Sequence, residues 1–231
     1  MRRLHNSRDT ALERPKNLAT ECPFIAAMEL DLAGVHADRA YAMLSALITP
    51  RPIAWVSTVD LEGAVNVAPF SFFNVLGVDP PVVGFYLADR TDGTPTLTVQ
   101  NIASTREFVV NLVDESVADA MLLTTASLPA GASKLERAGL TAAASTVVRP
   151  PRIAESPASL ECTEYQTLLI GANRFLVGLV QRIHVREDLA DSERMRIHTE
   201  RFHSVGRMGG QNAYCRTRDR FELLPPKASA G

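Results

Sequence analysis

Hydrophobic residues along this chain fall mostly into short runs with the length and composition of β-strands. Runs rich in valine, isoleucine, phenylalanine and threonine predict strands at 53–59, 64–72, 82–87, 108–113, 165–170 and 174–185. Helical patterning appears in four stretches, at 38–47, 98–104, 116–125 and 133–138. These strands do not alternate regularly with helices, so the pattern predicts a mainly β fold, an antiparallel β-barrel with short helices.

The segment 49–81 departs most clearly from ordinary strand patterning. Two strand-like runs flank a tight turn at 60–63, and a polar-decorated stretch follows before the chain closes at Asp79, Pro80 and Pro81. Pro69 lies inside that stretch and has no N–H for a sheet ladder, so the backbone there must lie at an edge or a bulge. Nearby amides are then free to bond a planar heterocycle that carries carbonyls and ring nitrogens.

Several motifs in this segment have counterparts in one family. PRPIA at 50–54, VST at 56–58, NVAPFSFFN at 66–74 and DPP at 79–81 are followed by NI at 101–102, EFVVN at 107–111, LERAGL at 135–140 and GRMGG at 206–210. In this order they closely resemble the flavin reductase-like, flavoredoxin-type family of FMN-binding split barrels. The resemblance spans roughly 30–214 and implies an antiparallel barrel of Greek-key type that binds FMN.

The composition fits one domain with additional segments. The 231 residues, 46% of them hydrophobic, can bury one sizeable core. We expect an N-terminal extension at 1–27, with disorder or a later start at Met28 as open alternatives, a split-barrel domain at 28–215 and a tail at 216–231. The formal net charge of −2 provides no electrostatic attraction to nucleic acid or to an anionic membrane. Arginines that crowd 194–220 are interleaved with acids, which favours a solvated, salt-bridged surface.

The cysteines and the absence of long apolar runs bear on location. Cys22, Cys162 and Cys215 have no metal-ligand spacing and cannot all pair, so a reducing compartment fits best, and Cys162 is expected to be a small buried hydrophobe. No apolar run approaches 18 residues and no secretory signal is present. The sequence therefore predicts a cytoplasmic protein.

The resemblance also implies where the cofactor binds. In the family, the flavin ring lies against the segment that corresponds to 66–74, where backbone amides reach the pyrimidine carbonyls and N5. Side chains of Asn66 and Ser71 are candidates for additional bonds, because both are polar among apolar neighbours. The cofactor-binding residues expected on this basis are Arg51, Pro52, Ser57, Thr58, Asn66, Val67, Ala68, Pro69, Phe70, Ser71, Phe73, Asn74, Arg90, Thr98, Asn101 and Arg207.

A purely structural role remains an open alternative for several of these residues. At least two of the phenylalanines at 70, 72 and 73 are expected to be core residues, and Ser57 and Thr58 can simply face the barrel. Arg51 can be a plain surface arginine. Arg207 can bind phosphates, or it can be an exposed residue of a glycine-rich turn.

The phosphate end needs a cation or a helix N-terminus. Counting back from Asn101 places Thr98 at the threonine of the family's Lys-Asp-Thr motif, while Thr96 and Leu97 occupy its lysine and aspartate positions. That departure removes one expected cation and leaves Arg90 and Thr98 as the phosphate candidates.

The leading functional hypothesis is an FMN-binding oxidoreductase that takes a hydride from NADH or NADPH. Such transfer to N5 needs proximity and orientation rather than an acid or base, so no catalytic side chain is assigned. His203 is considered as a proton donor, although a surface position is expected for it. The resemblance implies a homodimer with flavin near the interface and a possible partner monooxygenase. An FMN-holding electron carrier and a flavin-dependent enzyme acting on a small organic substrate are the alternatives.

Overall fold

The computed structural model describes residues 27–129, 131–171 and 173–224. By their internal contacts the described residues divide into two compact units, with the boundary between Ala40 and Tyr41. The first unit contains a turn in which the Asp31 carboxylate accepts a bond from Gly34 N (2.8 Å), and then a short 3-10 helix, η1 (Ala37–Arg39). The expected extension at 1–27 lies almost wholly outside the described residues.

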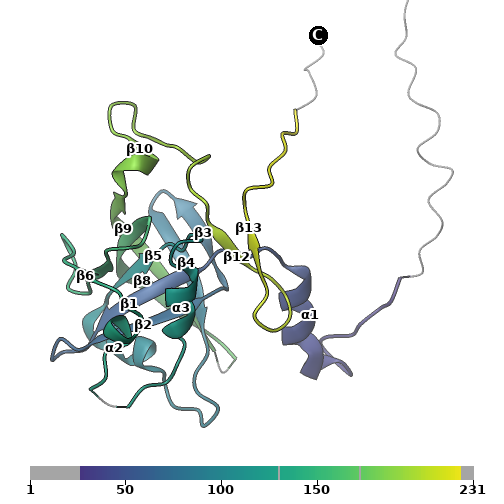
Figure 1. Cartoon of the computed structure of the whole chain (residues 1–231). Helices are drawn as coiled ribbons and strands as arrows, with labels where there is room; N and C mark the ends of the chain where they lie inside the picture. The colour runs from purple at the N-terminus through teal and green to yellow at the C-terminus, as the bar shows by residue number, and fades with distance from the viewer. Residues whose placement is uncertain (1–26, 130, 172, 225–231) are drawn as a thin grey trace, which may run out of the picture. The chain divides into compact units, whose positions relative to one another are not determined.

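The second unit is built on a seven-stranded sheet in which every pair of neighbours is antiparallel (Figure 1). Its strand order is β2-β1-β5-β8-β9-β4-β3, so β2 and β3 form the two edges. The predicted mainly β, antiparallel architecture is therefore confirmed. The strands are β1 (Ala54–Val59), β2 (Val65–Phe70), β3 (Phe73–Val78), β4 (Pro81–Leu87), β5 (Glu107–Asn111), β8 (Ala158–Ile170) and β9 (Asn173–Val185).

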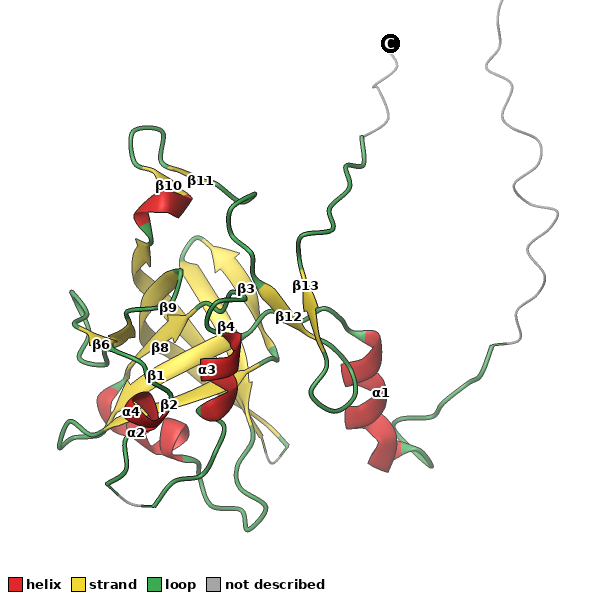
Figure 2. Cartoon of the chain, viewed as in Figure 1, coloured by secondary structure: helices red, strands yellow, loops and turns green. Residues whose placement is uncertain are grey.

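Short helices and two-stranded ladders complete this unit (Figure 2). The helices predicted at 38–47, 98–104, 116–125 and 133–138 are all present, with ends displaced by one or a few residues. Their bounds are α1 (Ala40–Leu47), α2 (Leu97–Thr105), α3 (Ala118–Leu123) and α4 (Lys134–Arg137), with η2 (Glu187–Leu189) near the end of β9. The small ladders pair β6 (Ala142–Ala143) with β7 (Arg152–Ile153), β10 (Ala190–Asp191) with β11 (Arg196–Ile197), and β12 (Val205–Arg207) with β13 (Tyr214–Arg216).

Two strand predictions need correction. The predicted strand at 64–72 ends at Phe70, and a separate strand that the pattern did not indicate, β3, begins at Phe73. The predicted strand at 165–170 is only the last part of the 13-residue β8. Its first half was missed because it carries a buried polar residue, Glu161, where alternation calls for an apolar one. Pro69 lies in the edge strand β2, as its missing N–H requires.

Two hydrophobic clusters lie on opposite faces of the sheet. One surrounds Phe85 and Phe108, whose rings meet edge to face at 5.5 Å, and includes Ile102 from α2. Phe70 and Phe73 pack against this cluster, in line with the expected core role of two of the three phenylalanines. The other cluster contains Trp55 of β1 together with residues of α3 and α4. These clusters hold α2 and α4 beside the edge strand β2.

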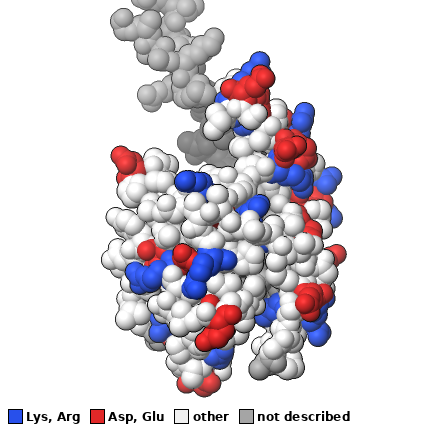
Figure 3. All heavy atoms as spheres, turned by 90° about the vertical axis from the view of Figure 1, so that its left-hand side faces the viewer, with Lys and Arg blue, Asp and Glu red and all other residues white. Residues whose placement is uncertain are grey.

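Charges on the surface are mixed in sign. On the face shown in Figure 3, basic and acidic side chains are interspersed rather than gathered by sign. In the predicted salt-bridged region, Arg216 and Arg218 both pair with Glu115, at 3.0 and 2.7 Å. No helix within the described residues is long and apolar enough to cross a membrane.

Candidate flavin site

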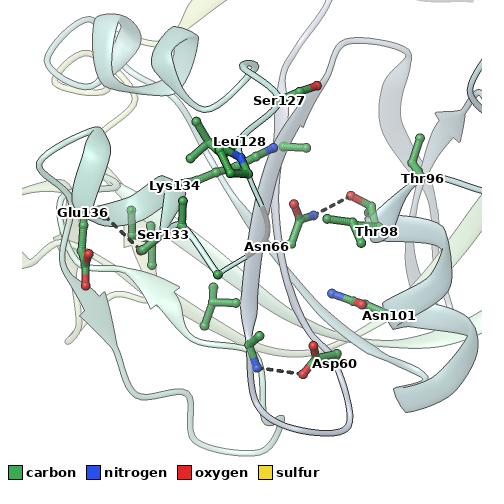
Figure 4. A pocket seen from close by; sticks show the side chains of 18 of the residues that line it. Asp60, Asn66, Thr96, Thr98, Asn101, Ser127, Leu128, Ser133, Lys134 and Glu136 are labelled. Carbon is green, nitrogen blue, oxygen red and sulfur yellow. Dashed lines mark hydrogen bonds between the residues drawn. The ribbon is translucent and has the colours of Figure 1, made fainter.

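A pocket of about 1270 Å³ lies along the edge strand β2 (Figure 4). Its walls come from β2, from the loop that leads into α2, and from the chain around α4. In Figure 4 the Asn66 side chain points toward Thr98 of α2, while Lys134 reaches in from α4 on the opposite side of the strand. Its lining includes these residues with polar side chains: Asp60, Asn66, Arg90, Thr91, Asp92, Thr96, Thr98, Asn101, Ser127, Ser133, Lys134, Glu136 and Thr141.

The N-terminus of α2 opens onto this pocket. Thr96 is the N-cap residue, yet its side chain makes no capping hydrogen bond. Thr96 Oγ1 is buried and, in the part of the chain that the structure describes, has no hydrogen-bond partner. Buried hydroxyls are normally paired, and the first amides of a helix lack intrahelical acceptors. This corner of the pocket therefore presents unsatisfied donors in a place where an anion would be stabilised.

A short loop places Arg90 beside that helix end. The Asp92 carboxylate accepts bonds from both N (2.8 Å) and Oγ1 (2.6 Å) of Thr94, and these bonds lower the pKa of Asp92. Arg90 Nη1 donates to the Pro95 carbonyl at 2.6 Å and to Thr94 Oγ1 at 3.3 Å. The loop thus holds the exposed guanidinium at the mouth of the pocket.

A chain of side-chain hydrogen bonds fixes α2 against the sheet. Asn66 Nδ2 donates to Thr98 Oγ1 at 3.0 Å, and Asn101 Nδ2 donates to Thr58 Oγ1 at 3.0 Å. Thr58 Oγ1 lies 3.5 Å from the Asn66 carbonyl and closes the chain. All four residues are buried. Their bonds set the position of the α2 N-terminus relative to β2.

The pocket gathers part of the predicted site. Asn66, Ala68, Phe70, Arg90, Thr98 and Asn101 line it. Thr58 lies directly behind the lining through its bond to Asn101. Ser57 lies deeper, on the face of β1 that carries Trp55, where its hydroxyl donates to the Pro151 carbonyl at 2.5 Å. It therefore faces away from the cluster that contains Ala54 and Val56. The predicted residues outside the lining are Arg51, Pro52, Ser57, Thr58, Val67, Pro69, Ser71, Phe73, Asn74 and Arg207.

Arg51 is buried, unlike the plain surface arginine that the sequence also allows. It is 7% exposed, and its guanidinium donates to the Ile48 carbonyl (2.8 Å), to the Met208 carbonyl (3.2 Å) and to the Ser45 carbonyl. The surface alternative is therefore wrong, because Arg51 joins the end of α1 to the chain after β12. Ser71 Oγ accepts a long bond of 3.5 Å from Arg51 Nε and belongs to the same contact.

Arg207 folds onto its own glycine-rich loop. Its guanidinium carbon lies 4.9 Å from the centre of the Tyr214 ring, and its nitrogens donate to the carbonyls of Ala213 (3.1 Å) and Gly210 (3.3 Å). Arg207 is half-buried at the end of β12, so it is not the exposed arginine of the alternative, and its donors are used by the carbonyls of its own loop. His203 lies outside the pocket lining, and Cys162 is fully buried, as expected of a small hydrophobe.

Lys134 is the site residue that sequence reasoning missed. Its Nζ donates to the Val67 carbonyl of β2 at 3.0 Å, and burial lowers the pKa of this amine. The motif LERAGL follows directly at 135–140, but one lysine in a polar stretch carries no signal of its own. Only the packing of α4 against β2 places Lys134 in the pocket.

Comparisons with known proteins place the chain in a family. Residues 45–206 match the model of the flavin reductase like domain. A Deinococcus radiodurans protein is 41% identical over 198 residues, 84% of this chain and 87% of that protein. Two crystal structures, each 33% identical, are similar along 99% of their own chains. Pseudomonas fluorescens 2-nitrobenzoate 2-nitroreductase has a TM-score of 0.78 and covers 88% of this chain, and Bacillus cereus nitrilotriacetate monooxygenase component B has a TM-score of 0.79 and covers 86%. The chain therefore belongs to the flavin reductase-like family of split-barrel proteins.

Proposed function

We propose that the pocket along β2 binds FMN and that the protein is an NAD(P)H-dependent flavin reductase. The observation that carries this proposal is the combination, in one cavity, of a free sheet edge, the open N-terminus of α2 and two cationic side chains. The free sheet edge offers backbone groups to a heterocycle, while the helix N-terminus and the cations offer donors and positive charge to a phosphate. Membership of a flavin reductase-like family supports the choice of ligand.

The residues present fit FMN. The orphaned hydroxyl of Thr96, the amides at the start of α2 and the guanidinium of Arg90 supply donors and positive charge for a phosphate. Thr98 and Asn66 lie next to this end and would face the ribityl chain. The volume of about 1270 Å³ lies somewhat above the range of typical small-ligand pockets, so it leaves room for a ring system as well.

The chemistry divides between ligand and protein. Bound flavin supplies a two-electron carrier whose N5 accepts a hydride from NADH or NADPH. The protein binds and orients the ring. The Asn66–Thr98 and Asn101–Thr58 hydrogen bonds fix the position of α2 relative to β2 and β1. No acid or base is required of the protein for this step.

A binding titration and a turnover assay test the proposal. The absorbance spectrum of the purified protein, followed by titration with FMN, should show a flavin band and saturable binding. NADH and NADPH oxidation, with and without added FMN, should then show flavin-dependent turnover with at least one of the two. A protein that does not bind FMN would refute the proposal, and one that binds FMN but oxidises neither nicotinamide would be an electron carrier.

The electron acceptor has two candidates. The Bacillus cereus relative is a monooxygenase component, which favours delivery of reduced flavin to a partner monooxygenase. The Pseudomonas fluorescens relative is a nitroreductase of equal identity, which favours reduction of an organic substrate at the flavin itself. Anaerobic turnover of 2-nitrobenzoate with product analysis separates them, because only the second candidate consumes the nitro compound.

Our proposal includes a homodimer. The edge strand β3 leaves apolar side chains in solvent, with Val75 63% and Val78 84% exposed, and on α1 Tyr41 is 74% and Leu47 79% exposed. Exposed apolar edge strands are normally covered, and a second copy of this chain is the occupant that the family resemblance implies. Light scattering at micromolar concentration should give the dimer mass, and Val78→Lys should shift it toward the monomer. A wild-type monomer that binds FMN tightly would rule the dimer out.

A further inference from the structure

Lys134 has an unusual environment for a lysine. Its side chain enters the pocket from α4, a partly buried position, and its Nζ donates to one neutral acceptor, the Val67 carbonyl, at 3.0 Å. None of the ion pairs among residues 27–129, 131–171 and 173–224 includes Lys134. A cation that has lost part of its hydration and faces only a carbonyl gains from a negative charge placed beside it.

The geometry of β2 defines what lies next to this cation. β2 pairs with β1 alone, so every second residue directs its backbone groups away from the sheet. Because the Val67 carbonyl meets Lys134, the Val67 N–H faces the same free edge. Pro69, two residues on, contributes a carbonyl but no N–H. Val67 is fully buried and lies outside the pocket lining, so the ammonium group of Lys134 is the donor that reaches the pocket here.

Lys134 and the phosphate donors occupy different parts of the pocket. Arg90, Thr96 and Thr98 belong to the α2 wall, whereas Lys134 belongs to the α4 wall, and β2 runs between them (Figure 4). One ligand that places its phosphate at α2 and lies along β2 would bring its ring system toward Lys134. The acids in the lining, Asp60, Asp92 and Glu136, form no ion pair with this lysine.

We propose that Lys134 binds the N1–C2=O edge of the flavin and stabilises the negative charge that this edge carries when the flavin is reduced. The inference rests on the proposed function and adds a residue that sets the relative affinity for the two redox states. Lys134 thus binds the reduced ligand more strongly than the oxidised one, and it raises the midpoint potential of the bound flavin.

The test compares Lys134→Gln with wild type. Glutamine keeps a donor for the Val67 carbonyl and removes the charge, so the contact between α4 and β2 can persist. Dissociation constants are measured anaerobically for oxidised and for reduced FMN. The affinity for the oxidised form should change little, and the affinity for the reduced form should fall about tenfold. A tenfold difference corresponds to a decrease of about 30 mV in the two-electron midpoint potential, which redox titration measures independently.

Two further variants control the experiment. Lys134→Arg keeps the charge and should recover most of the potential. Arg137→Met removes one cation from the same helix at an exposed position outside the lining, and should leave the potential and both affinities unchanged. If Lys134→Gln fails to fold, the comparison of Lys134→Arg with wild type still reports the potential, and a large decrease there would contradict a role of charge.

Other outcomes would overturn the inference. An equal loss of oxidised and reduced FMN would make Lys134 a general packing contact. A loss confined to FMN and absent with riboflavin would mean that Lys134 binds the phosphate. Either result leaves the proposed flavin reductase intact, whereas a wild-type protein that binds no flavin would refute both.

Discussion

Asn66 provides the sharpest test of the site, because one side chain joins the strand to the helix that forms the pocket. Its Nδ2 donates to Thr98 Oγ1 at 3.0 Å, and the two residues are 7% and 2% exposed. Asn66→Ala removes a neutral hydrogen bond worth about 0.5–1.5 kcal/mol and leaves the buried Thr98 hydroxyl with one partner fewer. We expect a free energy of unfolding lower by about 1–2 kcal/mol, and for a unit of this size a melting temperature lower by about 2–8 °C.

FMN affinity should decrease in the same variant. If the Asn66 amide contacts the ligand, the loss of one hydrogen bond corresponds to a two- to thirteenfold weaker dissociation constant, or about 0.5–1.5 kcal/mol. Fluorescence quenching of FMN measures the affinity, and thermal melting measures stability. Gln181→Ala is the matched control, since its amide also donates to a threonine hydroxyl, Thr163 Oγ1 at 3.1 Å, and neither residue lines the pocket.

The two variants separate a ligand contact from a structural role. Gln181→Ala should lower the melting temperature without changing FMN affinity. An Asn66→Ala protein that melts earlier but binds FMN as wild type does would refute the placement of the flavin beside Asn66. An unchanged melting temperature would instead show that the bond to Thr98 does not stabilise the fold.

Two further predictions concern charge. Arg90→Ala should weaken FMN binding far more than riboflavin binding, because only FMN carries the dianionic phosphate, and Thr98→Ala should act in the same direction but less; equal losses for both flavins, measured by fluorescence quenching, would move the phosphate elsewhere. The buried Glu161 carboxylate loses hydration, which raises its pKa, but bonds from Thr146 N (2.7 Å), Val147 N (2.7 Å) and His184 outweigh this and lower the pKa. Its stabilisation is therefore present above the unfolded value of about 4.3 and is lost as pH falls through the lower folded pKa. Glu161→Gln should cost about 1.5–3 kcal/mol at pH 7 in denaturant titrations, with a difference from wild type that shrinks below about pH 4; a difference that does not depend on pH would contradict this account.

Much of the fold was predictable because its signals are local. Apolar runs and proline positions depend on backbone sterics within a few residues, and they indicated most strands, all four helices and the edge position of Pro69. The strand β3 was missed, since its side chains are mostly exposed and mark no buried face. The first half of β8 was missed because Glu161 is satisfied by amides 14 and 15 residues away in the sequence, which no local pattern reveals.

The site, too, was predictable where its signals are local and was not where they depend on tertiary contacts. The sequence by itself determined the family resemblance and predicted Asn66, Arg90, Thr98 and Asn101, which line the pocket, because these residues lie in or close to recognisable motifs. Only the tertiary structure decided that Arg51 and Arg207 donate to backbone carbonyls, and that Lys134 enters the pocket. The physical reason is that the partners of a long charged side chain are set by which backbone carbonyls and ring faces fold within its reach. That depends on contacts between elements far apart in the chain, such as Lys134 and Val67, which are separated by 67 positions.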